Sequence, residues 1–397
     1  MDLFDKCKNF TLAREYREMG IYPYFHELET RQDVEVVMEG KRRIMLGSNN
    51  YLGLTINKEV TDAAKSAIDQ YGSGCSGSRF LNGTLNLHVL LEKELAEFIG
   101  KEACVTFSTG FQSNLGIISA VAGRHDYLIL DKEDHASIYC AARLSYAEML
   151  RYEHNDMEDL ERILKSLPLD AGKLIVTDGV FSMGGDICKL PEIVTLAKKY
   201  NARTMVDDAH GLGVLGKHGR GTAEHFGLTD EVDIIMGTFS KSLASLGGYM
   251  VADEYVIEYV RHKSNPFIFC ASITPASCAS TLAALRVLKK NPGLVRRLEE
   301  IGDYVRAGLT KRGVPIRHSD RTPIVPIYTK EFDRTLMVAK ALYDAGVYAN
   351  PVLPPATPPT DCLIRTSYMA SHTNELLDEA MDIIASVISE FGLIQEV

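Results

Sequence analysis

Short runs of consecutive apolar residues alternate with helical patterns through the middle of the chain. The strand-like runs cover residues 103–107, 127–130, 173–177, 203–206 and 233–236. They are continuously apolar, which is typical of a parallel sheet that helices cover on both faces. Residues 189–200 have apolar side chains spaced by about 3.6 residues and a proline in the first turn, which predicts an amphipathic helix. The pattern predicts an α/β fold with a mostly parallel sheet.

The same pattern divides the chain into three regions. Residues 1–55 form an N-terminal arm with a charged helical stretch, an aromatic cluster and a short β-like run at 34–38. Residues 56–290 form a large domain that closes with a long helix, and Asn291-Pro-Gly follows as a plausible hinge. Residues 291–397 are expected to form a smaller α/β domain that ends in an amphipathic helix. A length of 397 residues favours two hydrophobic cores.

The amino-acid composition limits which binding partners and which cellular location are expected for the chain. Hydrophobic residues make up 46% and charged residues 24%, which is ordinary for a globular protein. The net charge of −10 argues against nucleic acid or an anionic membrane surface as the main partner, so any membrane contact is peripheral at most. The sequence has no apolar run of about 18 residues and no signal-peptide core at its N-terminus. The eight cysteines are scattered without a CxxC pair, which indicates reduced thiols and a cytoplasmic location.

A lysine among hydroxyls and glycines follows the last apolar run of the large domain. Thr238, Ser240 and Lys241 come directly after this run, and Gly247-Gly248 closes the segment. Ligands of open α/β sheets bind beyond the carboxyl ends of the strands. Hydroxyls and backbone N–H groups suit a phosphate, and the amine suits a Schiff base with a carbonyl compound or with pyridoxal phosphate (PLP). A surface lysine after a strand is the alternative.

Three more strand ends carry side chains that could meet Lys241 at the same edge. Gly110 and Phe111 open a helix whose backbone N–H groups could bind an anion, although an ordinary N-cap by Ser108 or Thr109 is the favoured interpretation of this segment by itself. His135 could stack on an aromatic ring, or simply be a satisfied histidine at a helix start. Ser182 offers a hydrogen-bond donor in a glycine-containing loop.

A fourth strand end combines acids, a histidine and glycines. Asp207 could hold a pyridinium nitrogen protonated, and His210 could orient that carboxylate or touch the ring. The glycines at 211, 213 and 216 also match G-x-G-x-x-G, but four residues separate them from the strand, which disfavours a dinucleotide site. No G-x-S-x-G elbow accompanies the acid and histidine as a hydrolase would require, and no spaced ligand set indicates a metal.

Two arginines are candidates for substrate contacts. Arg79 lies in the glycine-rich stretch 71–84, for which a flexible loop is the alternative interpretation. Arg365 lies inside an apolar run and needs an anionic partner, which could be an amino-acid carboxylate or an internal acid.

Five ordered motifs spread over more than 300 residues resemble the α-oxoamine synthases, PLP-dependent enzymes of fold type I. They are Ser48-Asn-Asn-Tyr-Leu-Gly-Leu, Asp178-Gly-Val-Phe-Ser-Met, Val206-Asp-Asp-Ala-His-Gly-Leu-Gly, Gly237-Thr-Phe-Ser-Lys-Ser, and Arg365 with His372-Thr373. Within the family, the stretches at 72–84, 241–248 and 354–358 most resemble the bacterial serine palmitoyltransferases. The resemblance implies a large domain with a seven-stranded type of sheet and a homodimer with a shared active site.

The resemblance also implies roles for residues. Lys241 forms the Schiff base and serves as acid and base, Asp207 pairs with the ring nitrogen, and His135 stacks on the ring. Ser182 and His210 approach the ring hydroxyl. The phosphate is held by Gly110, Phe111, Thr238 and Ser240, and by Thr274 of the partner chain. Asn50, Arg79 and Arg365 face the substrates, with Asn50 and Arg365 on the amino-acid carboxylate.

The implied reaction is the decarboxylative condensation of serine with a long-chain acyl thioester, carried by CoA or an acyl carrier protein, which gives a ketosphinganine. One departure concerns the substrate: Leu353 stands where some bacterial relatives carry an arginine that handles its carboxylate. Cysteate, glycine and alanine therefore remain alternatives to serine. An NAD-linked Rossmann enzyme is a remote alternative, and a silent binding subunit is disfavoured because Lys241 is present.

Overall fold

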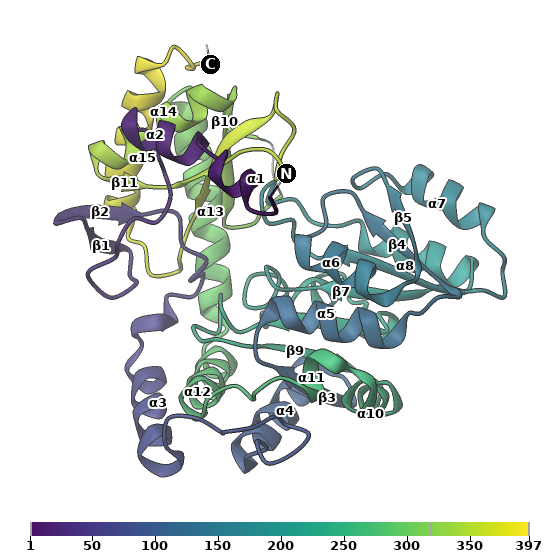
Figure 1. Cartoon of the computed structure of the whole chain (residues 1–397). Coiled ribbons are helices and arrows are strands. Elements are labelled where there is room, and N and C mark those ends of the chain that lie inside the picture. Colours follow the sequence, from purple (N-terminus) through teal and green to yellow (C-terminus); the bar gives the residue numbers. More distant parts are fainter. Residues whose placement is uncertain (1, 318–319, 396–397) are drawn as a thin grey trace. The chain divides into compact units, whose positions relative to one another are not determined.

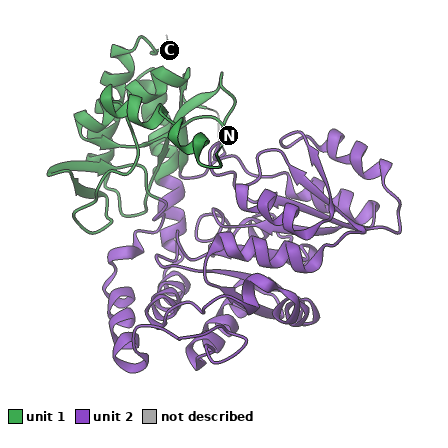
Figure 2. Cartoon of the chain, viewed as in Figure 1, with its two compact units in different colours: residues 1–48, 301–319, 324–397 green, residues 49–300, 320–323 purple. Residues whose placement is uncertain are grey.

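The chain folds into two compact units, which Figure 2 colours separately. The computed structural model describes residues 2–317 and 320–395. Unit 1 comprises residues 1–48, 301–319 and 324–397, and unit 2 comprises residues 49–300 and 320–323. The division differs from the three regions expected from the sequence, because the first 48 residues join the C-terminal part of the chain in one unit.

Unit 2 is built on a seven-stranded sheet with the strand order β3-β9-β8-β7-β6-β4-β5. Its strands are β3 (Ala103–Phe107), β4 (Asp126–Asp131), β5 (Glu148–Tyr152), β6 (Gly172–Asp178), β7 (Arg203–Asp207), β8 (Ile234–Thr238) and β9 (Gly248–Ala252). Neighbours from β5 to β8 pair in parallel, and β9 runs antiparallel to both β8 and β3. This confirms the mostly parallel sheet.

Helices cover the sheet of unit 2, as Figure 1 shows. The helices of unit 2 are α3 (Lys58–Tyr71), α4 (Asn86–Ile99), α5 (Gly110–Val121), α6 (Ala136–Ser145), α7 (Met157–Ser166), α8 (Leu190–Lys199), α9 (Thr222–His225), α10 (Glu254–Lys263), α11 (Asn265–Ile268) and α12 (Pro275–Lys290), with 3₁₀ turns at Leu54–Ile56 and Thr229–Glu231. Buried side chains such as Ile117, Ile138 and Val260 pack from the helices onto strand residues such as Val176 and Met236. This apolar layer holds the strand ends, and the loops that follow them, in fixed positions.

The five apolar runs of the sequence all form strands of this sheet, and two strands were not predicted. β5 is an edge strand whose residues are mostly exposed or half-buried, so it lacks a continuous apolar run. β9 begins at Gly248, a residue that the sequence pattern assigned to a loop. The helix expected at 189–200 is α8, and α12 begins directly after its N-cap Thr274.

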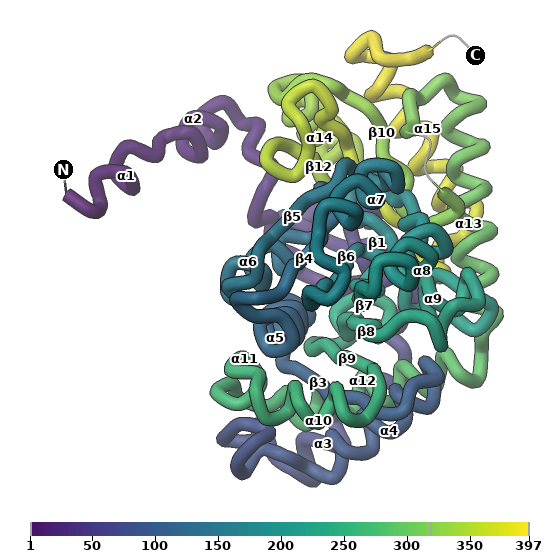
Figure 3. The backbone as a smooth tube through the Cα atoms, turned by 90° about the vertical axis from the view of Figure 1, so that its right-hand side faces the viewer, coloured from purple at the N-terminus to yellow at the C-terminus, as the bar shows by residue number. Residues whose placement is uncertain are grey.

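Unit 1 contains two three-stranded sheets. One joins β1 (Glu35–Met38), β2 (Lys41–Met45) and β11 (Val347–Tyr348), and the antiparallel other joins β10 (Ile324–Lys330), β13 (Cys362–Ser367) and β12 (Asn350–Val352). Its helices are α1 (Asp5–Lys8), α2 (Leu12–Glu18), α14 (Phe332–Ala345) and α15 (Asn374–Glu390), and α13 (Gly293–Lys311) begins in unit 2 and ends in unit 1. In Figure 3, α1 projects outward, whereas α2 contacts α14 through the rings of Tyr16 and Phe332, whose centroids lie 6.0 Å apart.

The core of unit 1 combines residues from both ends of the chain. Ile44 and Leu46 pack with Ile327, Val347 and Ile384, all of them fully buried. None of the helices in the described residues is long and apolar enough to cross a membrane.

Candidate active site

Loops at the carboxyl ends of the parallel strands of unit 2 surround a cavity of about 280 Å³. Its lining includes Gly110, Phe111 and Asn114 of α5, His135, Asp207, His210, Thr238, Ser240 and Lys241, together with Thr109, Ser137, Asp178, Ala209, Met236 and Leu246. Eight residues singled out in the sequence therefore share one cavity, although they span more than 130 positions. The place at the strand ends is the one expected for the ligand site of an α/β sheet.

The first turn of α5 and the end of β8 form one wall of the cavity. Thr109 caps the helix by accepting a hydrogen bond from the Gln112 backbone N–H at 3.1 Å, so the N-cap interpretation of this segment is correct. Thr238 Oγ1 lies 2.8 Å from Ser240 Oγ and donates to the Gly247 carbonyl at 2.9 Å. Hydroxyls and a helix N-terminus face the same space, and together they suit an anion such as a phosphate.

Glycine is required at position 110 because the first turn of α5 and the end of β8 approach each other closely. A Cβ built on this residue would lie 2.7 Å from Thr238 Oγ1 and 2.8 Å from Thr238 Cβ. Carbon atoms in contact normally lie about 3.5 to 4.0 Å apart. Glycine therefore lets the α5 backbone approach Thr238.

A hydrogen-bonded chain connects Asp207 with His135 across the back of the cavity. Asn114 donates from Nδ2 to Asp207 Oδ2 at 2.7 Å and to Ser137 Oγ at 2.8 Å. Ser137 Oγ in turn lies 2.7 Å from His135 Nδ1. Asp207 Oδ1 accepts from the Ala209 backbone N–H at 3.0 Å. The carboxylate and the imidazole are thus fixed relative to each other by Asn114 and Ser137, two residues that sequence reasoning did not single out.

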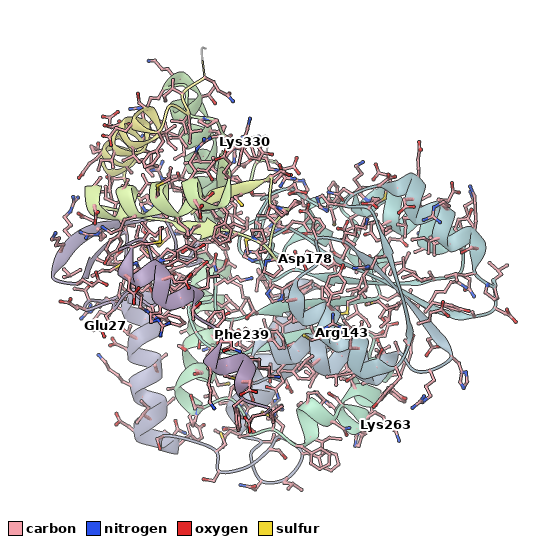
Figure 4. The ribbon with its side chains drawn as sticks, turned by 45° about the horizontal axis from the view of Figure 1, so that its top comes forward. Glu27, Arg143, Asp178, Phe239, Lys263 and Lys330 are labelled. Carbon is pink, nitrogen blue, oxygen red and sulfur yellow. The ribbon has the colours of Figure 1, made fainter. Side chains whose placement is uncertain are left out.

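Burial and neighbouring charges set the electrostatics of this cavity. Partial burial of the His135 ring is the main cause that lowers its pKa, Asp207 opposes this shift, and the Lys241 charge adds to it. Burial likewise raises the pKa of Asp178 well above the usual range, and the neighbouring Asp207 raises it further. Asp178, labelled in Figure 4, ends β6 next to Asp207 on β7.

His210 is held by Tyr51, a residue of the motif at positions 48–54. Its Nδ1 lies 2.7 Å from the hydroxyl of Tyr51, and the two rings meet edge to face with centroids 5.9 Å apart. Both side chains are buried. Tyr51 thereby fixes the ring of His210 at the cavity, a role that the sequence did not reveal.

Two residues expected at the cofactor do not line the cavity. Ser182 is half-buried in the loop after β6, and Thr274 is exposed at the N-terminus of α12, where it accepts from the Ser277 backbone N–H at 3.2 Å. Their contacts with a cofactor remain predictions.

Arg79 lies in an internal ion network and not at the cavity. Its Nη1 lies 2.7 Å from Glu92 Oε1 and also 2.7 Å from Thr106 Oγ1, and its side chain is only 8% exposed. Arg261 reaches the other carboxylate oxygen of Glu92 at 3.1 Å. This pairing ties the glycine-rich stretch to α4 and gives Arg79 a structural partner in place of the expected substrate.

The two remaining substrate candidates are both buried. Asn50 donates from Nδ2 to Thr55 Oγ1 at 2.8 Å within unit 2. Arg365 lies on β13 of unit 1, where its Nη1 is 3.4 Å from Ser367 Oγ. Leu353, at the departure from the family pattern, packs with Leu336 and Cys362 in a small apolar cluster of unit 1.

The glycines that match G-x-G-x-x-G serve a different purpose. Asp208 is fully buried and accepts hydrogen bonds from both the backbone N–H and the hydroxyl of Thr222. A Cβ at Gly211 would collide with the Asp208 carboxylate, and Gly213 and Gly216 have positive φ angles of 73° and 85°. Burial raises the pKa of Asp208 to about 7. The glycines allow a tight loop to wrap around this acid, which leaves no need for a dinucleotide to explain them.

The cavity residues fit the PLP group that the resemblance implies. The buried Oδ1 atoms of Asn114 and Asp178 have no hydrogen-bond partner within the described residues, so polar capacity remains for a ligand. The wall at Gly110 and Thr238 suits a phosphate, Asp207 suits a pyridinium, and Lys241 supplies an amine. Within the described residues, no group of three or more His, Cys, Asp or Glu side chains is placed to hold a metal ion.

Comparison with known proteins gives consistent matches over the whole chain. The family of class I and II aminotransferases matches residues 41–384. Serine palmitoyltransferase of Sphingobacterium spiritivorum is 50% identical over 388 residues, which cover 98% of this chain and 97% of the relative. The enzyme of the same name from Bacteroides thetaiotaomicron is 49% identical, with 99% of each chain covered. A high-resolution structure of SPT with PLP as the internal aldimine has a TM-score of 0.96 at 37% identity, covering 99% of this chain and 100% of that one.

Proposed function

Since the chain belongs to the family of class I and II aminotransferases, and within it to the α-oxoamine synthases with the PLP-dependent fold type I, we propose that it condenses L-serine with a long-chain acyl-CoA. The chain is a PLP-dependent acyltransferase of the serine palmitoyltransferase type. The observation that carries the proposal is the shared cavity of Lys241, Asp207, His135 and a phosphate-compatible wall.

The reaction joins two carbon atoms and releases two products. A bond forms between the serine α-carbon and the acyl carbonyl carbon, the thioester C–S bond breaks, and CoA leaves as the thiol. The serine carboxylate leaves as carbon dioxide, so the product is a 3-ketosphinganine, an intermediate suited to sphingolipid synthesis. When bound, PLP supplies an electron sink for the negative charge that develops at the α-carbon.

The side chains of the cavity have separable tasks in this proposal. Lys241 anchors the cofactor and carries the proton removed from the serine α-carbon. Asp207 keeps the ring nitrogen protonated, and Asn114 and the Ala209 backbone N–H orient its carboxylate. His135 would stack on the ring, and His210, oriented by Tyr51, would approach the ring hydroxyl.

The substrate contacts complete the proposal. Gly110, Phe111, Thr238 and Ser240 hold the phosphate, with Ser182 and Thr274 as further predicted contacts. Asn50 and Arg365 are proposed for the serine carboxylate because Arg79 already pairs with Glu92. Leu353 removes one charged contact found in some relatives, so cysteate, glycine and alanine are the alternatives to test.

We propose that two copies of the chain share this active site. Phe111 and Leu246 line the cavity and are 46% and 53% exposed, and Leu81 and Phe269 of unit 2 are 77% and 82% exposed. Large apolar side chains at this exposure are more typical of an interface than of a monomer surface. A second copy would bury them.

The eight cysteines, all free thiols, support a cytoplasmic location for the reaction.

The test is reconstitution of the purified chain with PLP, followed by mass spectrometry of the products formed from palmitoyl-CoA with serine, cysteate, alanine or glycine. Formation of ketosphinganine from serine, together with its loss in Lys241→Ala, is the expected result. A sulfonated product from cysteate and none from serine would replace the substrate assignment. Protein that binds no PLP and retains full activity as Lys241→Ala would overturn the whole proposal.

A further inference from the structure

His154, outside the cavity, lies between two of the loops that reach it. It lies two residues after the end of β5, and its side chain is 19% exposed. Its Nδ1 lies 2.9 Å from Asp131 Oδ1 and its Nε2 lies 2.5 Å from Asp186 Oδ2. The Glu133 carboxylate is 3.8 Å from Nε2. The three acids come from the turn after β4 and from the loop after β6, so one imidazole ring faces carboxylates of two separate loops.

This geometry requires a proton on each ring nitrogen. An ionised carboxylate can only accept hydrogen bonds, and a neutral imidazole has one N–H donor. Two carboxylates on opposite nitrogens are therefore both satisfied only by an imidazolium cation. Burial alone would lower the pKa of His154, but the hydrogen bonds to Asp131 and Asp186 outweigh it and raise the pKa to about 10.

The first carboxylate organises the turn that carries His135. Asp131 is fully buried, and its oxygens also accept from the backbone N–H groups of Glu133 and Asn155, both at 2.8 Å. The Asp131 backbone N–H donates to Asp134 Oδ2 at 3.0 Å, and the turn ends at His135, the N-cap of α6. The position of His135 thus depends on a turn folded around Asp131.

The second acid, Asp186, belongs to the loop that carries Ser182. The Asp186 carbonyl accepts from the Phe181 backbone N–H at 2.9 Å, and the Phe181 ring meets the His154 ring edge to face at 4.4 Å. Asn155, next to His154, donates from Nδ2 to the Ile187 carbonyl at 3.2 Å. Ser182 directly follows Phe181, so the contacts of His154 fix the backbone on which that hydroxyl stands.

We propose that His154 is a cationic positioning residue that locks the turn 131–135 and the loop 179–188 together, and so sets where His135 and Ser182 stand at the cofactor. The proposal rests on the proposed function for its consequence in catalysis, but the lock itself is a property of the chain without cofactor. The loops would open more readily if the cation were absent, because Asp131 and Asp186 would lose their shared charged partner and keep the neutral hydrogen bonds of Asn155.

Hydrogen exchange of the cofactor-free protein tests the lock directly. His154→Gln keeps a donor but not the charge, and exchange in segments 131–137 and 179–188 is expected to accelerate about tenfold or more, because each lost charge-assisted hydrogen bond corresponds to at least that factor. Asp186→Asn is expected to accelerate exchange in 179–188 and to leave 131–137 protected. His218→Gln is the matched control. His218 is also paired with a carboxylate, that of Glu224, but its side chain is exposed and it does not join the two loops.

A spectroscopic readout separates positioning from simple stability. The visible circular dichroism of bound PLP reports the groups around the ring, and it is expected to change in His154→Gln and to stay unchanged in His218→Gln. Unchanged exchange in both segments of His154→Gln, or acceleration spread evenly over unit 2, would overturn the proposal. If His154→Gln does not fold, the segment-specific effect of Asp186→Asn decides the question. Wild-type protein that binds no PLP would refute the proposed function, and the exchange data would still judge the lock.

Discussion

Gly110→Ala is expected to weaken PLP binding more than it destabilises the fold. The added Cβ would lie 2.8 Å from Thr238 Cβ, about 0.7 Å or more inside the normal contact distance. Thr238 is 4% exposed, and its hydroxyl is bonded to the Gly247 carbonyl at 2.9 Å and to Ser240 at 2.8 Å. The side chain cannot move away without breaking these contacts, so the first turn of α5 and the end of β8 must separate.

The magnitude follows from two opposing terms. Overpacking of this kind costs roughly 1 to 3 kcal/mol, and alanine is better than glycine in a helix by about 0.5 to 1 kcal/mol. The net loss of about 1 kcal/mol corresponds to a fall in Tm of roughly 2 to 4 °C in a unit of this size. The phosphate loses hydrogen bonds to a charged group, each contributing about 1.5 to 3 kcal/mol, so the Kd for PLP is expected to rise about tenfold to a hundredfold.

The assay is titration of the cofactor-free protein with PLP, with thermal unfolding measured on the same samples. Gly123→Ala is the control, because the nearest heavy atom to its added Cβ is Asp126 Oδ2 at 3.8 Å. This control is expected to match the wild type in both measurements. Gly110→Ala with wild-type PLP affinity would show that the wall of Gly110 and Thr238 does not hold the phosphate.

Three further predictions concern the ionised groups. Arg79→Gln is expected to lower the free energy of unfolding, measured in urea, by about 3 kcal/mol, because it leaves the buried Glu92 with one remaining arginine partner. An increase in the KM for serine without loss of stability would instead support the substrate role expected from the sequence. Burial lowers the pKa of His372 to about 4, so as pH falls the histidine is protonated in the unfolded chain before it is protonated in the folded chain. The free energy of unfolding should therefore fall by up to about 3 kcal/mol between pH 6.5 and 4. Denaturation measured at several pH values should show a flatter pH dependence for His372→Asn. In the folded chain the pKa of His154 is raised to about 10, so protonated His154 stabilises the fold fully below about pH 6.5. The difference in Tm between the wild type and His154→Gln should shrink as pH rises from 6.5 to 10. A Tm difference that stays constant over this range would contradict the ion pairs of His154.

Residues with distinctive chemistry could be found from the sequence, and the residues that orient them could not. Lys241, Asp207 and His135 each follow an apolar run, and parallel strands bring such positions to one edge. Asn114 lies in the second turn of α5 and Ser137 in the first turn of α6, where an amide or a hydroxyl is unremarkable until the fold brings them together. The partner of Arg79 was open for the same reason, since Glu92 becomes its neighbour only when α4 packs beside β3.

The elements show the same distinction. α8 could be predicted to within one residue at each end because its apolar spacing and the proline in its first turn are local signals. The exposed edge strand β5 has no such signal. The pairing of β2 with β11 joins residues from opposite ends of the chain, and local patterns carry no information about it.

That pairing has a consequence for synthesis on the ribosome. β2 ends at Met45 and its partner β11 begins at Val347, so about 300 residues must be made before the sheet can form. At roughly 5 to 20 residues per second, this delay is about 15 to 60 s. Val36, Met38 and Ile44, all buried in the finished protein, face solvent or a chaperone during that time. Unit 2 emerges during this time and can fold first. C-terminal truncations should therefore yield a folded unit 2 whose N-terminal segment is aggregation-prone and protease-sensitive.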